Sequence, residues 1–180
     1  MRKIGMEKLR QKIRAGNELV RQARINALES AIAIDEMLSA IIAEYFADDD
    51  SRRETLYEVL SFLTTREKIE TFSILETSRG IQFSKRYRRV TQRLNLLNDY
   101  RNTMVHGFLS LSYNPKLWRG RGKLTPFPLT TRLVRKMEEV GETAYDSLSI
   151  IFKRMVDQHR KGMPNSRKSL GRAPRKGENS

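Results

Sequence analysis

The chain contains no cysteine, which excludes disulfide bridges and thiolate zinc sites. It also lacks any apolar run of about 18 residues, the length that a membrane-spanning helix needs. The first residues, 1–8, are charged and lack the apolar core of a secretory signal peptide. We therefore expect a cytoplasmic protein with no membrane segment, because a chain without cysteine suits a reducing compartment.

Proline and glycine are scarce, and neither occurs in residues 18–47. Apolar residues recur there at spacings of three and four, the pattern of an amphipathic helix. We expect one helix over this stretch, about 45 Å long, to be the spine of a helical bundle. Residues 1–16 before it are basic, and we expect an arm or a frayed helix.

The net charge is +14, and the two ends carry nearly all of it. Residues 1–24 hold eight Lys or Arg and two Glu (net +6), and residues 153–180 hold nine and two (net +7). Basic ends suit a polyanion, most simply RNA, although they could equally serve only to keep the protein dissolved. Residues 160–180 are too polar to bury a core, and we expect a disordered basic tail.

Capping signals divide the middle of the chain into further helices. Ser51 and Thr64 are each followed three residues later by Glu, the spacing of a capping box. They predict helices over 51–62 and 65–78, whose expected buried residues include Val59 and Ile74.

Two more helices complete the expected bundle. One should cover 85–106 after an N-terminal cap at Ser84, and the last should cover 132–159 after Thr130 or Thr131. The prediction is an all-α bundle of about five helices over residues 17–159.

Between these two helices, residues 110–130 contain three prolines and two glycines, so no helix can form. We expect a long basic loop there, or a small hairpin. Arg119, Arg121 and Trp118 are candidates for RNA contact, because cations and aromatic rings bind phosphates and bases. Trp118 could instead pin the loop to the core.

The first half of the 85–106 helix is strongly basic, and Arg86, Arg89 and Arg93 are further RNA-binding candidates. A run of like charge is often only a solvated face. This run, however, precedes on the same helix the most distinctive stretch of the chain, which favours phosphate contact.

That stretch is Arg101-Asn102-Thr103-Met104-Val105-His106, which contains one of only two histidines. On a helix, Asn102 and His106 share a face, and the long side chain of Arg101 can curl toward them. The set combines a group that titrates near neutral pH, a phosphate-binding cation and a neutral amide.

An Arg-polar-x-x-x-His motif followed by Gly107, late in an all-α domain, resembles the HEPN superfamily. The resemblance covers residues 17–159 in layout. It implies a metal-independent endoribonuclease without cofactors, of the kind found as toxins or phage-defence effectors. It also implies a homodimer in which two motifs face one cleft, and a cognate antitoxin or regulatory protein as a further partner.

The resemblance assigns a role to each motif residue. His106 would be the acid/base group for attack of the RNA 2′-oxygen, and Arg101 would stabilise charge on the phosphate. Asn102 would orient His106 or the phosphate. The family often has an acidic or polar residue on the first helix facing the motif, and Asp35 is the candidate here, with Arg101 as its expected partner. Glu36 and Glu29 are alternatives, and an ordinary exposed acid is another.

Two further interpretations remain open. The same fold could bind nucleic acid or serve as a regulatory subunit without cleaving RNA. It could also be a regulator that uses the bundle only for protein contacts. His159, the second histidine, is expected to be a solvated residue near a helix end.

Overall fold

The computed structural model describes residues 2–77, 89–110, 116–119 and 125–160. These form five helices and three short strands, namely α1 (Arg2–Phe46), α2 (Asp50–Leu60), α3 (Thr65–Thr77), α4 (Val90–His106), β1 (Phe108–Ser110), β2 (Lys116–Arg119), β3 (Thr125–Pro128) and α5 (Thr131–Arg160). The expectation of a predominantly helical protein is confirmed. Of the tail expected at residues 160–180, Arg160 is the last residue of α5, and residues 161–180 lie outside the described residues.

Helix α1 is longer than expected. It has 45 residues and is about 67 Å long, and residues 2–16 form its first turns. The only helix breakers in that part are Gly5 and Gly16, and single glycines weaken a helix by only about 1 kcal/mol. No helix in the described part of the chain is long and apolar enough to cross a membrane.

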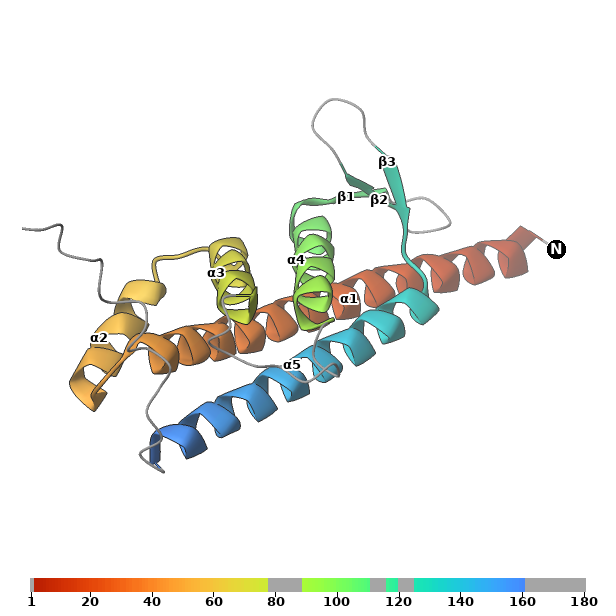
Figure 1. Cartoon of the computed structure of the whole chain (residues 1–180). Helices are drawn as coiled ribbons and strands as arrows, with labels where there is room; N and C mark the ends of the chain where they lie inside the picture. The colour runs from red at the N-terminus through yellow and green to blue at the C-terminus, as the bar shows by residue number, and fades with distance from the viewer. Residues whose placement is uncertain (1, 78–88, 111–115, 120–124, 161–180) are drawn as a thin grey trace, which may run out of the picture.

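Helices α1 and α5 run side by side in the same direction (Figure 1). The Asn26 side-chain amide of α1 donates to Glu138 of α5 over 3.4 Å, and further along Glu44 meets His159. Between these contacts Gly141 packs against Ser30, where a Cβ on residue 141 would lie 3.0 Å from the Ser30 hydroxyl oxygen. The absence of a side chain at Gly141 thus lets the two helices approach closely.

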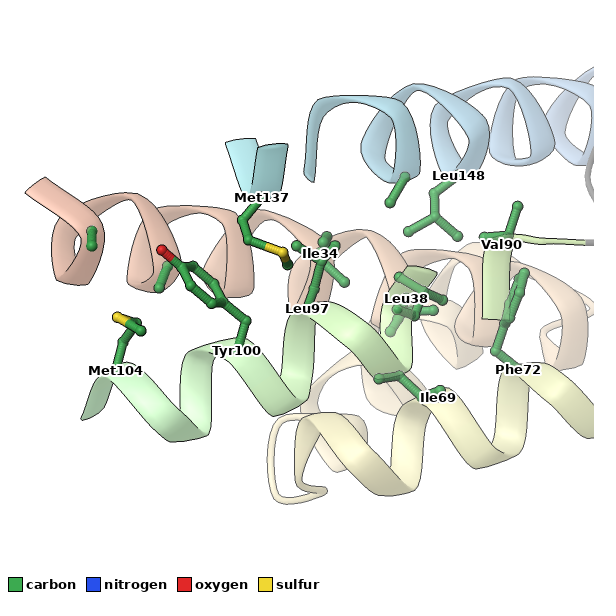
Figure 2. Close-up of a cluster of buried hydrophobic side chains, with 14 of the residues drawn as sticks. Ile34, Leu38, Ile69, Phe72, Val90, Leu97, Tyr100, Met104, Met137 and Leu148 are labelled. Carbon is green, nitrogen blue, oxygen red and sulfur yellow. The ribbon is translucent and has the colours of Figure 1, made fainter. Parts of the chain in front are cut away.

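The core lies where α1, α3, α4 and α5 meet (Figure 2). Its buried side chains include Ile34 and Leu38 of α1, Phe72 of α3, Leu97 of α4 and Leu148 of α5. A smaller cluster around Ile42 and Leu60 attaches α2 to the end of α1. Helix α4 is therefore held on its inner face by three other helices.

The helix starts agree only partly with the capping signals. At α3, the Glu67 carboxylate accepts from the Thr64 N–H (2.7 Å) and the Thr64 hydroxyl accepts from the Glu67 N–H, as predicted. Thr130 likewise caps α5. Helix α2, however, is capped by Asp49, whose carboxylate accepts from the Arg52 N–H, and not by Ser51. Asp49 reaches the first free N–H groups because α2 begins one residue earlier than expected.

Helix α4 begins at Val90, with Arg89 as its N-cap, instead of following Ser84. Val59 of α2 and Ile74 of α3, which were expected to be buried, are exposed. The reason is geometric: the apolar stripes on these helices are wider than the surface that their neighbours cover.

The region expected to be a loop or hairpin forms a small antiparallel sheet in the order β1-β2-β3. Trp118 of β2 lies opposite Phe108 of β1 and Pro126 of β3. The prolines Pro126 and Pro128 occur in an edge strand, where a missing backbone N–H is tolerated. The sheet continues from the end of α4 and leads into α5.

Candidate functional site at the end of helix α4

The motif occupies the last two turns of α4. Thr103 and Met104 are buried on its inner side, while Arg101 and Asn102 are half-buried and His106 is exposed. His106 is also the last residue of the helix. The imidazole is therefore accessible to a ligand, while the preceding turn is held by the core.

Arg101 and Asn102 contact each other directly. One terminal nitrogen of the Arg101 guanidinium (Nη1) donates to the Asn102 side-chain oxygen over 2.9 Å. This bond turns the guanidinium toward the side of the helix that Asn102 and His106 share. It also assigns the Asn102 oxygen as an acceptor, so its amide N–H groups can donate to an anion.

A residue that the sequence reasoning missed, Arg24 of α1, holds the end of α4. Its Nε donates to the Met104 carbonyl oxygen (3.0 Å) and its Nη2 to the Gly107 carbonyl oxygen (3.3 Å). The last carbonyls of a helix lack partners within it and carry partial negative charge. Arg24 supplies donors and a positive charge there, next to His106. Its 80-residue separation from Met104 left no local signal in the sequence.

Gly107 ends the helix in an extended conformation, with φ −73° and ψ 136°. Any residue can adopt these angles, so the bend after the motif does not need the freedom of glycine. Its N–H bonds to the Thr103 carbonyl oxygen over 2.9 Å. The exit from α4 is thus fixed by this bond and by Arg24.

Asp35 does not pair with Arg101 as expected. Its carboxylate forms an ion pair with the buried Lys68 and accepts from the Thr65 hydroxyl (2.9 Å), both on α3. The expectation of a charged partner for Asp35 was correct, but the partner is Lys68 of α3 instead of Arg101 of α4. Glu36 and Glu29, the alternatives, are exposed.

The RNA-binding candidates are only partly described. Arg89 is exposed and Arg93 half-buried at the start of α4, about 12–18 Å along the helix from Arg101. Trp118 and Arg119 belong to β2, which follows the motif through β1. Arg86 and Arg121 lie outside the described residues.

His159 is not simply solvated, contrary to expectation. Its Nδ1 contacts the Glu44 carboxylate, which is 3% exposed and lies 2.7 Å from Nε of Arg53. Arg24 and Glu44 are 20 residues apart on α1, or about 30 Å. The two histidines of one chain are therefore too far apart to act on the same phosphodiester.

The inner side of α4 carries one unusual polar group. The Tyr100 hydroxyl is buried and has no hydrogen-bond partner among the described residues. Burial, and to a smaller extent the nearby charge of Glu138, raise the pKa of Tyr100 to about 12. The ring lines a small cavity with Asn26, Ala27, Ser30, Ala31, Leu97 and Met137. This cavity lies between helices and is separate from the exposed imidazole.

Among the described residues, no three His, Cys, Asp or Glu side chains lie close enough together to hold a metal ion. The chain matches no protein-family model, no curated protein and no solved structure. Any function must therefore be argued from the residues themselves.

Proposed function

We propose that this chain is a metal-independent endoribonuclease of the HEPN type, a toxin or defence effector that acts as a homodimer. One observation carries the proposal: an exposed imidazole, His106, lies on the same two turns of α4 as a guanidinium and an amide that are hydrogen-bonded to each other. Imidazole can transfer protons near neutral pH, and a guanidinium binds the oxygens of a phosphate.

The reaction needs three actions at one phosphodiester. A base removes the proton of the RNA 2′-hydroxyl, whose oxygen attacks the adjacent phosphorus. An acid protonates the departing 5′-oxygen as the P–O5′ bond breaks, leaving a 2′,3′-cyclic phosphate. Arg101 stabilises the charge that develops on the phosphoryl oxygens, and the Asn102 amide donates to the same group.

One chain supplies a single imidazole at this site, because His159 is about 30 Å away along α1. A second copy would bring a second His106, so that one imidazole acts as base and the other as acid. The need for a second imidazole supports the homodimer. The use of the 2′-hydroxyl as the attacking group supports RNA as the substrate.

The test is cleavage of labelled RNA by the purified protein in EDTA. We expect wild type to produce cyclic phosphate ends, and His106→Ala or Arg101→Ala to reduce the rate by about 10²-fold or more. Arg135→Ala is the matched control, because Arg135 is an exposed arginine of α5 whose loss removes the same charge.

Mixing the two inactive variants tests the shared cleft. If each site needs one His106 and one Arg101 from different copies, mixed dimers regain part of the activity. RNA binding that is equal in all proteins, with no cleavage, would instead indicate the alternative function, a non-catalytic HEPN-fold nucleic-acid-binding or regulatory protein.

A further inference from the structure

The first turns of α1 project beyond the rest of the bundle (Figure 1). Helices α1 and α5 run in parallel, with Asn26 beside Glu138. Helix α5 begins at Thr131, seven residues before Glu138. The residue seven positions before Asn26 on α1 is Leu19, which therefore lies beside the start of α5. Residues 2–18 therefore lie before the start of α5, a projection of about 25 Å that we call the α1 arm.

The α1 arm carries an apolar stripe in a regular register. Met6, Leu9, Ile13 and Gly16 follow one another at spacings of three and four, and the same spacing continues through Val20, Ala23 and Ala27 into the core. In the arm, Met6 is 57% exposed and Ile13 39% exposed. The arm thus extends the buried seam of α1 to a part of the helix that α5 does not cover.

A stripe of two positions per seven residues is the seam of a coiled coil. Arg10 directly follows Leu9, and Lys12 directly precedes Ile13, so the two positions that flank the seam between Leu9 and Ile13 are basic. Glu7 is the one acid of residues 6–16. In coiled coils these flanking charges select the partner. Lys8 and Arg14 add positive charge further around the helix.

These features distinguish between possible occupants. A second copy of the arm would bring like charges together on both flanks, which disfavours pairing. RNA would use the cations and leave the apolar stripe exposed. A membrane surface favours a broad apolar face with aromatic residues, whereas this stripe is narrow and residues 6–16 contain no aromatic ring.

We propose that residues 6–16 of the α1 arm are a docking surface for an acidic amphipathic helix of a partner protein. That helix would place apolar residues against Met6, Leu9 and Ile13, and Glu or Asp beside Arg10 and Lys12. Gly16 allows its backbone to come close at the end of the seam. The proposal does not depend on RNA cleavage, because none of these residues belongs to the α4 motif.

The test uses the full-length protein and a dye-labelled synthetic peptide of about four heptads, with Leu at the seam and Glu at both flanks. A peptide with Lys at the flanks is its matched control. Fluorescence anisotropy should show binding of the Glu peptide and at least about tenfold weaker binding of the Lys peptide.

Two sets of variants separate the seam from the charge. Met6→Gln/Leu9→Gln/Ile13→Gln and Arg10→Gln/Lys12→Gln should each weaken binding by about tenfold or more, while Gln11→Ala on the opposite side should not. Because these side chains are exposed or half-buried at the surface, circular dichroism should show all variants folded.

Other results would overturn the proposal. If the Glu peptide failed to bind, the proposal would be wrong. If it bound the triple Gln variant as tightly as wild type, the apolar stripe would not contribute, and the arm would be only a binding site for polyanions. Arm-dependent binding of poly(U), or of vesicles of phosphatidylserine, in place of the peptide would identify a different ligand. Self-association that the triple variant abolishes in sedimentation would identify a second copy.

Discussion

Asp35 of α1 and Lys68 of α3 form an ion pair that ties the two helices together in the core. The Lys68 side chain is 2% exposed and the Asp35 side chain 30% exposed. The Thr65 hydroxyl gives the carboxylate a second partner. A buried ammonium group without its carboxylate is costly, so breaking the pair destabilises the fold. We therefore assign Asp35 to the stability of the protein and not to catalysis.

We predict that Asp35→Asn lowers the free energy of unfolding by about 3–5 kcal/mol, because it leaves the Lys68 charge buried without compensation. Asp35→Asn/Lys68→Met should recover most of that loss. Urea unfolding of the wild type, the single variant and the double variant measures both effects. If Asp35 were instead part of the RNA-cleaving site, Asp35→Asn would abolish cleavage while stability stayed at the wild-type value.

This pair illustrates what sequence reasoning could predict. The helices were predictable from the spacing of apolar residues and from the capping box at Thr64, and the prolines between α4 and α5 excluded a helix there. Each of these patterns is visible within a few residues of sequence. The partner of Asp35 was not predictable, since Lys68 is 33 positions away and depends on which face of α3 packs against α1. Long-range polar contacts are set by the packing and leave no periodic signal.

The same limit applies at the end of α4. The position of the motif on a helix was predictable from the local pattern, whereas Arg24 looked like one cation among the many of α1. We predict that Arg24→Met destabilises the protein by about 1–3 kcal/mol, because two carbonyl oxygens at the helix end lose a charged donor. Arg24→Lys should restore only part, since an ammonium group cannot reproduce the forked geometry.

Urea unfolding measures the loss, and hydrogen exchange at the Gly107 amide shows whether it is local. Arg21→Met is the matched control, because Arg21 is exposed and its one ion pair among the described residues is with the exposed Glu18, so its loss should change stability little. Unchanged exchange at Gly107 in Arg24→Met would contradict the role given to Arg24.

Gly141 provides a test of the α1–α5 contact. A methyl group at this position would stabilise the helix itself by about 1 kcal/mol, because alanine is a better helix former than glycine. The same methyl group would lie 3.0 Å from the Ser30 hydroxyl oxygen. We predict that Gly141→Ala is more favourable in a Ser30→Ala background than in the wild type, by roughly 0.5–3 kcal/mol in a double-mutant cycle. Additive effects would mean that Ser30 does not limit the space. Gly141→Val, which is larger, should destabilise the wild type by about 1–3 kcal/mol.

Tyr100 gives the protein a predictable response to alkaline pH. Burial, and secondarily the charge of Glu138, raise the pKa of its phenol from 10.0 to about 12. The unfolded state therefore releases this proton at a lower pH than the folded state. The stability that the neutral phenol contributes is present below pH 10 and is lost as the pH rises toward about 12.

Tyr100→Phe removes the titrating group and a buried hydroxyl that has no partner among the described residues. We expect the variant to be as stable as wild type or slightly more stable at pH 7, because no hydrogen bond is lost and an unsatisfied polar atom is removed. Between pH 9 and 11 its stability should fall less than that of wild type. Urea unfolding at these pH values measures the difference.

Tyr145→Phe is the control, because Tyr145 is exposed and its loss should leave the alkaline decline in stability unchanged. A decline in Tyr100→Phe as steep as in wild type would show that another group causes it.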